Sequence, residues 1–141
     1  MSEDQAPALS REEIEAIIAK TPFAVWVGAR LDIYRRGEVE ISIPMRRDLT
    51  QHHGFGHGAI IGFLADSACA WAGASVAGDV VTSEYKLNLV APAVGQTLVG
   101  CGSVIHAGGR QVVCRADLYA IASERRKLVA TALATIVQVK R

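Results

Sequence analysis

Residues 59–77 are the feature that most restricts how this chain can fold. The segment AIIGFLADSACAWAGASVA is rich in alanine and other small residues, and its middle has few β-branched positions. This composition predicts one long helix that ends at Gly78. Because such a helix is apolar nearly all round, it must be buried inside the fold rather than lie on a surface.

Most of the remaining chain alternates between apolar and polar residues, which is the pattern of half-buried strands. The predicted strand runs are 23–34, 39–43, 83–89, 96–107, 112–118 and 128–139. Gly108-Gly109 is a hairpin signal, and residues 123–126 form the next turn. Connections this short favour a largely antiparallel sheet. The predicted fold class is therefore α+β, with that sheet wrapped around the single apolar helix.

The first 21 residues are expected to form a loose tail, residues 1–9, followed by a short helix. Ser10 and Glu13 have the spacing of a capping box. Apolar residues then recur at helical spacing up to Lys20, and Pro22 is expected to end this helix. We therefore divide the chain into an N-terminal segment, 1–21, and a main domain, 22–141.

The composition of the 141 residues excludes several classes of protein. Half of the residues are apolar and 21% are charged, so a substantial core is expected. The net charge is +1 without a basic block, which argues against nucleic acid or an anionic membrane as a partner. The acidic N-terminus does not resemble a signal peptide, and we expect no run long enough to span a bilayer. Cytoplasmic localisation is the resulting expectation.

The three cysteines, Cys69, Cys101 and Cys114, are odd in number and widely spaced, without a CxxC pair. This usage predicts reduced thiols that pack as small apolar side chains in a reducing compartment.

Asp66 is the most informative single residue. It is the only acidic residue between Asp48 and Asp79, and no Lys or Arg lies between Arg47 and Lys86. Burying an unpaired carboxylate costs several kcal/mol, so Asp66 needs hydrogen-bond donors, a shifted pKa or a solvent-filled cleft. Capping a loop or pairing with a distant arginine is the structural alternative.

The segment before the helix favours a catalytic interpretation of Asp66. Residues 51–58 read QHHGFGHG and place His57 and Gly58 at the helix N-terminus, where backbone N–H groups lack intrahelical partners. Those donors and the helix dipole suit a developing negative charge. A carboxylate about two turns further along, within reach of such a site, would provide the parts needed for acyl transfer.

This pattern resembles the PaaI-type family of hotdog-fold acyl-CoA thioesterases. The family combines Asn or Gln, Gly, His-Gly-Gly, a helix with Leu-x-Asp or Leu-x-Glu, and a later strand that ends near x-Pro-Ala. The resemblance covers roughly residues 22–139 and implies a hotdog fold, an antiparallel sheet wrapped around one long helix. The matching residues here are Gln51, Gly54, His57-Gly58, Leu64-Ala65-Asp66 and Thr82 through Pro92.

The resemblance also implies a role for each matching residue. Asp66 would be the nucleophile or general base, and the Gly58 N–H would bind the thioester oxygen. Gln51 would orient water or the reacting group, and His57 would shape the site or contact the thioester. Thr82 would reach the site from the neighbouring subunit, although a threonine is also an ordinary strand residue.

Assembly and cofactor use follow from the same resemblance. Active sites in this family form between two protomers, which implies a homodimer at minimum and commonly a homotetramer. No cofactor is implied, because coenzyme A belongs to the acyl-CoA or aryl-CoA substrate. Two positions depart from the pattern: Ala59 replaces the second Gly of His-Gly-Gly, and Ala70 stands where some relatives have Ser.

Further residues are candidates for substrate binding, each beside a structural alternative. His53 is expected at the pocket rim with His52, and no metal site is expected, because no Cys or carboxylate lies at ligand spacing. Trp71 could line an acyl pocket, but core packing is the alternative. Arg110 and Arg115 could hold CoA phosphates, and a solvated strand edge is the alternative for each.

Thioester hydrolysis is the leading functional hypothesis. Polarisation of the carbonyl by the helix N-terminus would accompany direct attack by Asp66 or activation of water. A hotdog dehydratase or hydratase is one alternative, but the chain lacks the expected His-aromatic-Pro loop. A non-catalytic acyl-CoA binding module is the other alternative. Thiol release separates hydrolysis from both.

Overall fold

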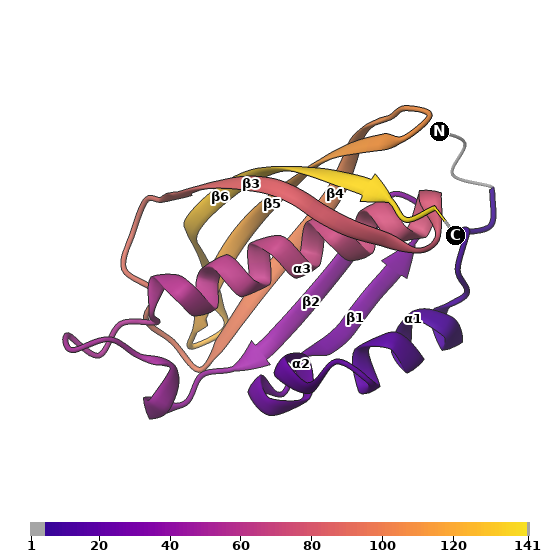
Figure 1. The fold of residues 1–141 in the computed structure, drawn as a ribbon. Helices are drawn as coiled ribbons and strands as arrows, with labels where there is room; N and C mark the ends of the chain where they lie inside the picture. Colours follow the sequence, from indigo (N-terminus) through magenta and orange to yellow (C-terminus); the bar gives the residue numbers. More distant parts are fainter. Residues whose placement is uncertain (1–4, 141) are drawn as a thin grey trace.

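The computed structural model describes residues 5–140, in which one curved sheet wraps around one long helix (Figure 1). The helices are α1 (Arg11–Ala19), α2 (Pro22–Val27) and α3 (Gly58–Ala77), with a short 3₁₀ turn at Arg47–Leu49. The strands are β1 (Arg30–Arg35), β2 (Glu38–Pro44), β3 (Val80–Leu89), β4 (Thr97–Ala107), β5 (Gln111–Ala122) and β6 (Arg125–Gln138).

The six strands form a single sheet in the order β1-β2-β4-β5-β6-β3, and every neighbouring pair is antiparallel. Helix α3 crosses the concave face and packs against β2 to β6 (Figure 1). This arrangement confirms the predicted α+β fold with a sheet wrapped around one buried helix. Strands β1 and β3 are the two edges of the sheet, so each has one side without a strand partner in the described chain.

The centre of the core lies between α3 and the inner face of the sheet. Leu64, Ala65, Ala68 and Cys69 of α3 are each at most 1% exposed. A Cβ added to Gly102 of β4 would collide with the backbone carbonyl of Ala68, so this position requires glycine. Small residues on both elements therefore let the helix lie close to the sheet.

All three cysteines are free thiols, as the sequence predicts. Cys69 and Cys114 are buried, and Cys101 is partly buried. Burial raises the pKa of the Cys114 thiol to about 12, so this side chain remains a neutral apolar group at ordinary pH.

The N-terminal helix agrees with its sequence signal. Ser10 and Glu13 form the complete capping box at the start of α1. Ile14 and Ile18 are buried in the same core as α3, so α1 covers part of the main fold.

The strand predicted for residues 23–34 is wrong in its first half. Helix α1 ends at Ala19 with Lys20 as its C-cap, before Pro22 as expected. Pro22 itself occupies the first turn of α2, where its missing N–H costs no hydrogen bond. Gly28 then ends α2 with a φ of +73°, a left-handed conformation that glycine adopts without strain. Only residues 30–35 form a strand, and the aromatic and β-branched residues of the segment 23–27 are helical instead.

The expectation that no segment is long enough to span a bilayer is also wrong by length and composition. Helix α3 has 20 residues with a mean hydropathy of 1.5 in its most apolar window, and it is the one such helix in residues 5–140. Within the fold, 72% of that window is buried. Burial of α3 against the sheet therefore explains why this helix is apolar nearly all round.

Candidate active site

The first turn of α3 presents one free backbone donor. His57 is the N-cap, and its Nδ1 accepts a hydrogen bond of 2.9 Å from the Ala59 N–H. The His57 carbonyl accepts from Ile60 and Ile61. Within residues 5–140, the Gly58 N–H meets no acceptor. Sequence reasoning placed this donor correctly, and the structure adds that His57 organises the turn.

Gln51 shapes the loop that leads into α3. Its side-chain carbonyl accepts hydrogen bonds from the backbone N–H groups of His53, at 2.6 Å, and Phe55, at 3.3 Å. The loop backbone closes with bonds from Gln51 N–H to the Phe55 carbonyl and from Gly54 N–H to the Gln51 carbonyl. The oxygen of the Gln51 amide is thus committed to the loop, which leaves its NH₂ group as the donor that can face a ligand.

An open groove of about 370 Å³ lies beside Gly58. The groove is bounded by the 51–58 loop and by the chain that follows β3. It is lined by Gln51, Phe55, Gly56, Gly58, Ile61, Leu89, Val90, Ala91, Pro92 and Ala93. Apart from Gln51, its lining residues are apolar or glycine, and the Gln51 amide and the Gly58 N–H are the polar groups that could orient a small molecule there.

Asp66 is partly exposed on α3 and accepts a hydrogen bond of 2.6 Å from the Thr82 hydroxyl of β3. No arginine or lysine forms an ion pair with it among the residues that the structure describes. The carboxylate therefore meets its hydrogen-bonding need through a neutral hydroxyl and solvent, and its charge is not cancelled. The structural alternative, an ion pair between Asp66 and a distant arginine, is therefore not formed within residues 5–140.

Thr82 contacts Asp66 of its own chain, because β3 runs back along α3 after the turn at Gly78 and Asp79. The implication of the family resemblance that this hydroxyl enters a site from the neighbouring subunit concerns a second copy of the chain and stays a prediction. This contact fixes the direction of the Asp66 carboxylate within one chain.

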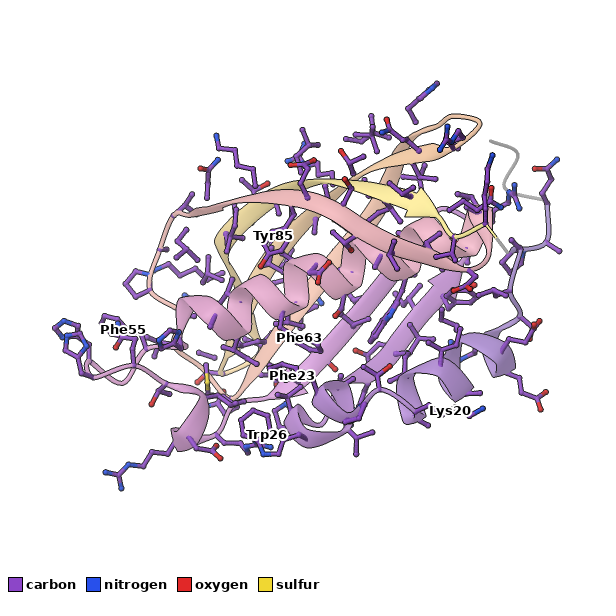
Figure 2. The ribbon with its side chains drawn as sticks, viewed as in Figure 1. Lys20, Phe23, Trp26, Phe55, Phe63 and Tyr85 are labelled. Atoms are coloured by element: carbon purple, nitrogen blue, oxygen red, sulfur yellow. The ribbon has the colours of Figure 1, made fainter. Side chains whose placement is uncertain are left out.

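The contact between α3 and β3 continues towards the start of the helix. A Cβ on Gly62 would lie 3.0 Å from the Tyr85 hydroxyl, and a Cβ on Gly58 would lie 3.3 Å from Leu89. The contacts between α3 and β3 thus extend from Thr82 and Asp66 to Leu89 and Gly58. Tyr85 points towards the middle of α3 (Figure 2). The sequence placed Tyr85 on an alternating strand but gave no signal that it faces Gly62.

Helix geometry separates the two catalytic candidates. Gly58 and Asp66 are eight residues apart on a continuous helix, which corresponds to about 12 Å along its axis. A thioester carbonyl bound to the Gly58 N–H is therefore too far from Asp66 of the same chain for attack. The expectation that the two groups lie within reach of one another fails for a single chain.

The other predicted binding residues are dispersed. His53 is exposed on the 51–58 loop and stacks with Phe55 at a centroid distance of 5.8 Å, near the groove. Trp71 is only 9% exposed and belongs to the core cluster, which favours the core-packing alternative over a place in an acyl pocket.

The two arginines lie away from both Gly58 and Asp66. Arg110 follows the tip of the β4–β5 hairpin, at the end of the molecule opposite the start of α3 (Figure 1). Arg115 alternates with the buried residues of β5, so it lies on the outer face of the sheet, where it pairs with Asp117 at 3.3 Å. A single chain therefore does not bring either arginine to the candidate site.

Metal binding finds no support in side-chain geometry. Across residues 5–140, no group of three or more His, Cys, Asp or Glu side chains is arranged to hold a metal ion. His52 and His53 stack on each other at a centroid distance of 4.1 Å instead of converging with His57 on a common point.

Comparisons with known proteins identify the family. The model of the thioesterase superfamily matches residues 53–125, which is more than half of the chain. A thioesterase family protein from Silicibacter pomeroyi is 33% identical, with a TM-score of 0.86 over 90% of this chain and 96% of that one. No curated protein sequence matches.

Two further solved structures share the fold at lower identity. The PaaI protein from the phenylacetic acid degradation operon of E. coli is 20% identical, with a TM-score of 0.83 over 92% of each chain. A variant of the phenylacetic acid degradation protein PaaI from Thermus thermophilus is 24% identical, with a TM-score of 0.74 over 84% of this chain and 99% of that one. From its sequence match and its hotdog fold, the chain belongs to the thioesterase superfamily.

Proposed function

We propose that this protein hydrolyses acyl-CoA or aryl-CoA thioesters to the free acid and CoA. Membership of the thioesterase superfamily supports thioester hydrolysis in general. The observation that carries the finer proposal is that α3 presents a Gly58 N–H without an acceptor and, about 12 Å further along its axis, an Asp66 carboxylate without an ion-pair partner among residues 5–140. These are the electrophile-stabilising and nucleophile-generating parts of an acyl-transfer site.

The reaction needs only groups of the chain, the substrate and water. The Gly58 N–H donates to the thioester oxygen and stabilises the negative charge that develops on it. Asp66 either removes a proton from water as the water oxygen bonds to the carbonyl carbon, or attacks that carbon itself to form an anhydride that water then hydrolyses. In both routes the C–S bond breaks, and the sulfur of CoA takes up a proton.

Because Gly58 and Asp66 lie about 12 Å apart along α3, the proposed site requires two copies of the chain. Strand β3 offers the contact between them. It is an edge strand whose outer side has no strand partner within residues 5–140, and Val81, Tyr85 and Leu89 are 56%, 42% and 55% exposed on it. Such an edge is a template for pairing with another strand, and a self-complementary antiparallel pair gives a two-fold dimer.

The register of that pair follows from the site. For Gly58 of one copy to meet Asp66 of the other, the two-fold axis must pass near position 62, midway between them. Gly62 contacts Tyr85, so the paired β3 strands would be centred on Tyr85. That register sets Glu84 opposite Lys86, which is a favourable cross-strand pair. This register supports the proposal of a two-fold dimer in which both copies contribute residues to each site.

A panel of CoA thioesters with aryl, short and long acyl groups tests the proposed function. We expect release of free thiol, detected with a thiol reagent, from at least one class of substrate. An acyl thioester that is modified without thiol release would instead indicate a dehydratase or hydratase. Saturable binding without any turnover would indicate a binding module, and either result would overturn the proposal.

Thr82 is proposed to act as a positioning residue for Asp66. Replacing Thr82 with valine removes the donor at nearly constant volume, and we expect kcat to fall roughly 10- to 150-fold, because hydrogen bonds to charged groups contribute roughly 1.5–3 kcal/mol. Thr82→Ser keeps a hydroxyl and should restore most of the rate. A purely structural role would instead lower the melting temperature of the valine variant and leave kcat per folded molecule unchanged.

A further inference from the structure

An exposed aromatic cluster joins α2 to the N-terminal half of α3. Phe23 and Trp26 of α2 have ring centroids 5.6 Å apart, and Phe23 lies 5.0 Å from Phe63 of α3. We call these three residues the aromatic cluster. Figure 2 shows them side by side below α3. Phe23 is 49% exposed and Trp26 is 55% exposed, so two large rings present much of their surface to solvent.

The cluster is held in place by polar contacts around it. Arg46 donates a hydrogen bond of 2.7 Å to the Trp26 carbonyl, and its guanidinium lies 5.1 Å from the Trp26 ring centroid. Asp48 accepts from the same arginine at 2.8 Å. This fixed arrangement lowers the entropy cost of binding a ligand against the rings.

Phe63 connects the cluster to the candidate catalytic carboxylate. It lies three residues before Asp66 on α3, a spacing that puts the two Cβ atoms about 5–6 Å apart on one helix face. Both side chains are partly exposed, and the neighbouring positions on this face, 59 and 70, are alanines. Thr82 contacts Asp66 from β3, and Phe63 packs against Phe23 of α2.

We propose that the aromatic cluster binds the acyl part of the substrate and favours aryl or arylalkyl acyl groups over short aliphatic ones. This proposal rests on the proposed function, because hydrolysis at Asp66 is what brings the acyl group beside Phe63. An aromatic acyl group that extends from the carbonyl can stack edge-to-face or offset on Phe63 and Phe23, and it buries their exposed surface.

The chemistry of the cluster fits an acyl group better than the CoA arm. The three side chains offer only the Trp26 indole N–H as a polar group, whereas the pantetheine arm carries amides that need hydrogen-bond partners. Arg46, whose guanidinium lies over the Trp26 ring, is already paired with Asp48 and bonded to the Trp26 carbonyl, which weakens its attraction for a phosphate. The groove beside Gly58, with the Gln51 amide, is the more suitable place for the CoA arm.

Two variants test the cluster, with one matched control. Phe23→Ala and Trp26→Ala each remove one ring, and Val25→Ala removes a 59%-exposed apolar side chain of the same helix outside the cluster. Rates of thiol release are compared for phenylacetyl-CoA, benzoyl-CoA and acetyl-CoA. We expect kcat/KM for the two aryl substrates to fall roughly 5- to 20-fold in each ring variant and to change less than about 2-fold for acetyl-CoA.

Other results of these experiments would contradict the acyl-binding role of the aromatic cluster or the proposed function. Equal losses on aryl and acetyl substrates, or no loss on any, would overturn the acyl-binding role while leaving thioester hydrolysis intact. Dissociation of the oligomer in Trp26→Ala, measured by analytical ultracentrifugation, would show that a second copy covers the cluster and would also overturn it. Absence of turnover in the unaltered protein would instead contradict the proposed function itself.

Binding of a non-hydrolysable aryl-CoA thioether gives a readout that does not depend on turnover. We expect Trp26→Ala to weaken its binding by a similar factor in isothermal titration calorimetry, with Trp26→Phe close to the unaltered protein. Equal affinities for the alanine variant and the unaltered protein would contradict contact between the cluster and the acyl group.

Discussion

Replacing Asp66 with asparagine is expected to lower kcat for thioester hydrolysis by about 10²–10⁴-fold, the range that general base catalysis contributes. Asparagine is neutral, so it can neither attack the carbonyl nor take a proton from water at neutral pH. Its side-chain oxygen can still accept the hydrogen bond from Thr82, and the fold should therefore persist. The rate of thiol release at saturating substrate measures the effect.

Asp32→Asn is the matched control, because Asp32 is an exposed carboxylate on β1 at the other edge of the sheet. Its variant should keep the rate of the unaltered protein, and circular dichroism should show both variants folded. Undiminished turnover in folded Asp66→Asn would remove Asp66 from the chemistry. Both the nucleophilic and the general-base routes require the carboxylate, so a loss of rate in this variant supports its role in either route.

The sequence was sufficient to predict α3 and its place in the fold, because its composition leaves few alternatives. A run of small and apolar residues this long cannot cover a surface, and the alternating strands around it had to provide the burial. The same reasoning isolated Asp66, since one acidic residue in such a helix violates the pattern and needs a cause. Placement of Gly58 at the helix N-terminus followed from the boundary of the apolar run.

Local patterns failed where tertiary contacts decide the outcome. Residues 23–27 have β-prone side chains, but Pro22 and Gly28 bracket a helical turn whose Ala24 and Val27 are buried in the core. Trp71 follows Asp66 by five residues, and that spacing turns its side chain away from the exposed face into the core. Sequence spacing alone also could not show that Thr82 reaches Asp66 within the same chain, because this depends on how β3 folds back along α3.

Gly58→Pro is expected to lower kcat by about 10²–10³-fold, the usual effect of losing one oxyanion donor. Gly58 is the first residue of α3, a position where proline is favoured because its missing N–H breaks no intrahelical bond. His57 already has φ −64° and ψ 141°, the conformation that a following proline requires. Gly58→Ala keeps the N–H and meets only the flexible end of Leu89 at 3.3 Å, so it should stay within a few-fold of the unaltered rate.

Because Gly58 and Asp66 of one chain lie too far apart to act together, mixed dimers can test whether each site joins Gly58 of one copy to Asp66 of the other. A mixed dimer of Gly58→Pro and Asp66→Asn chains would contain one site with both defects and one site with neither. After equal amounts of the two inactive variants are unfolded and refolded together, half of the dimers should be mixed. Activity should then recover to about a quarter of that of the unaltered protein.

This recovery depends only on which chain supplies each group. If Gly58 and Asp66 of one chain acted together, every chain in the mixture would carry a defect, and refolding together would restore nothing. A second mixture, of Gly58→Pro with Thr82→Val chains, tests whether Thr82 acts on Asp66 of its own chain. Thr82 positions Asp66 of its own chain, so the site that joins an intact Gly58 to an intact Thr82–Asp66 pair should recover in the same proportion, above the residual activity of Thr82→Val alone.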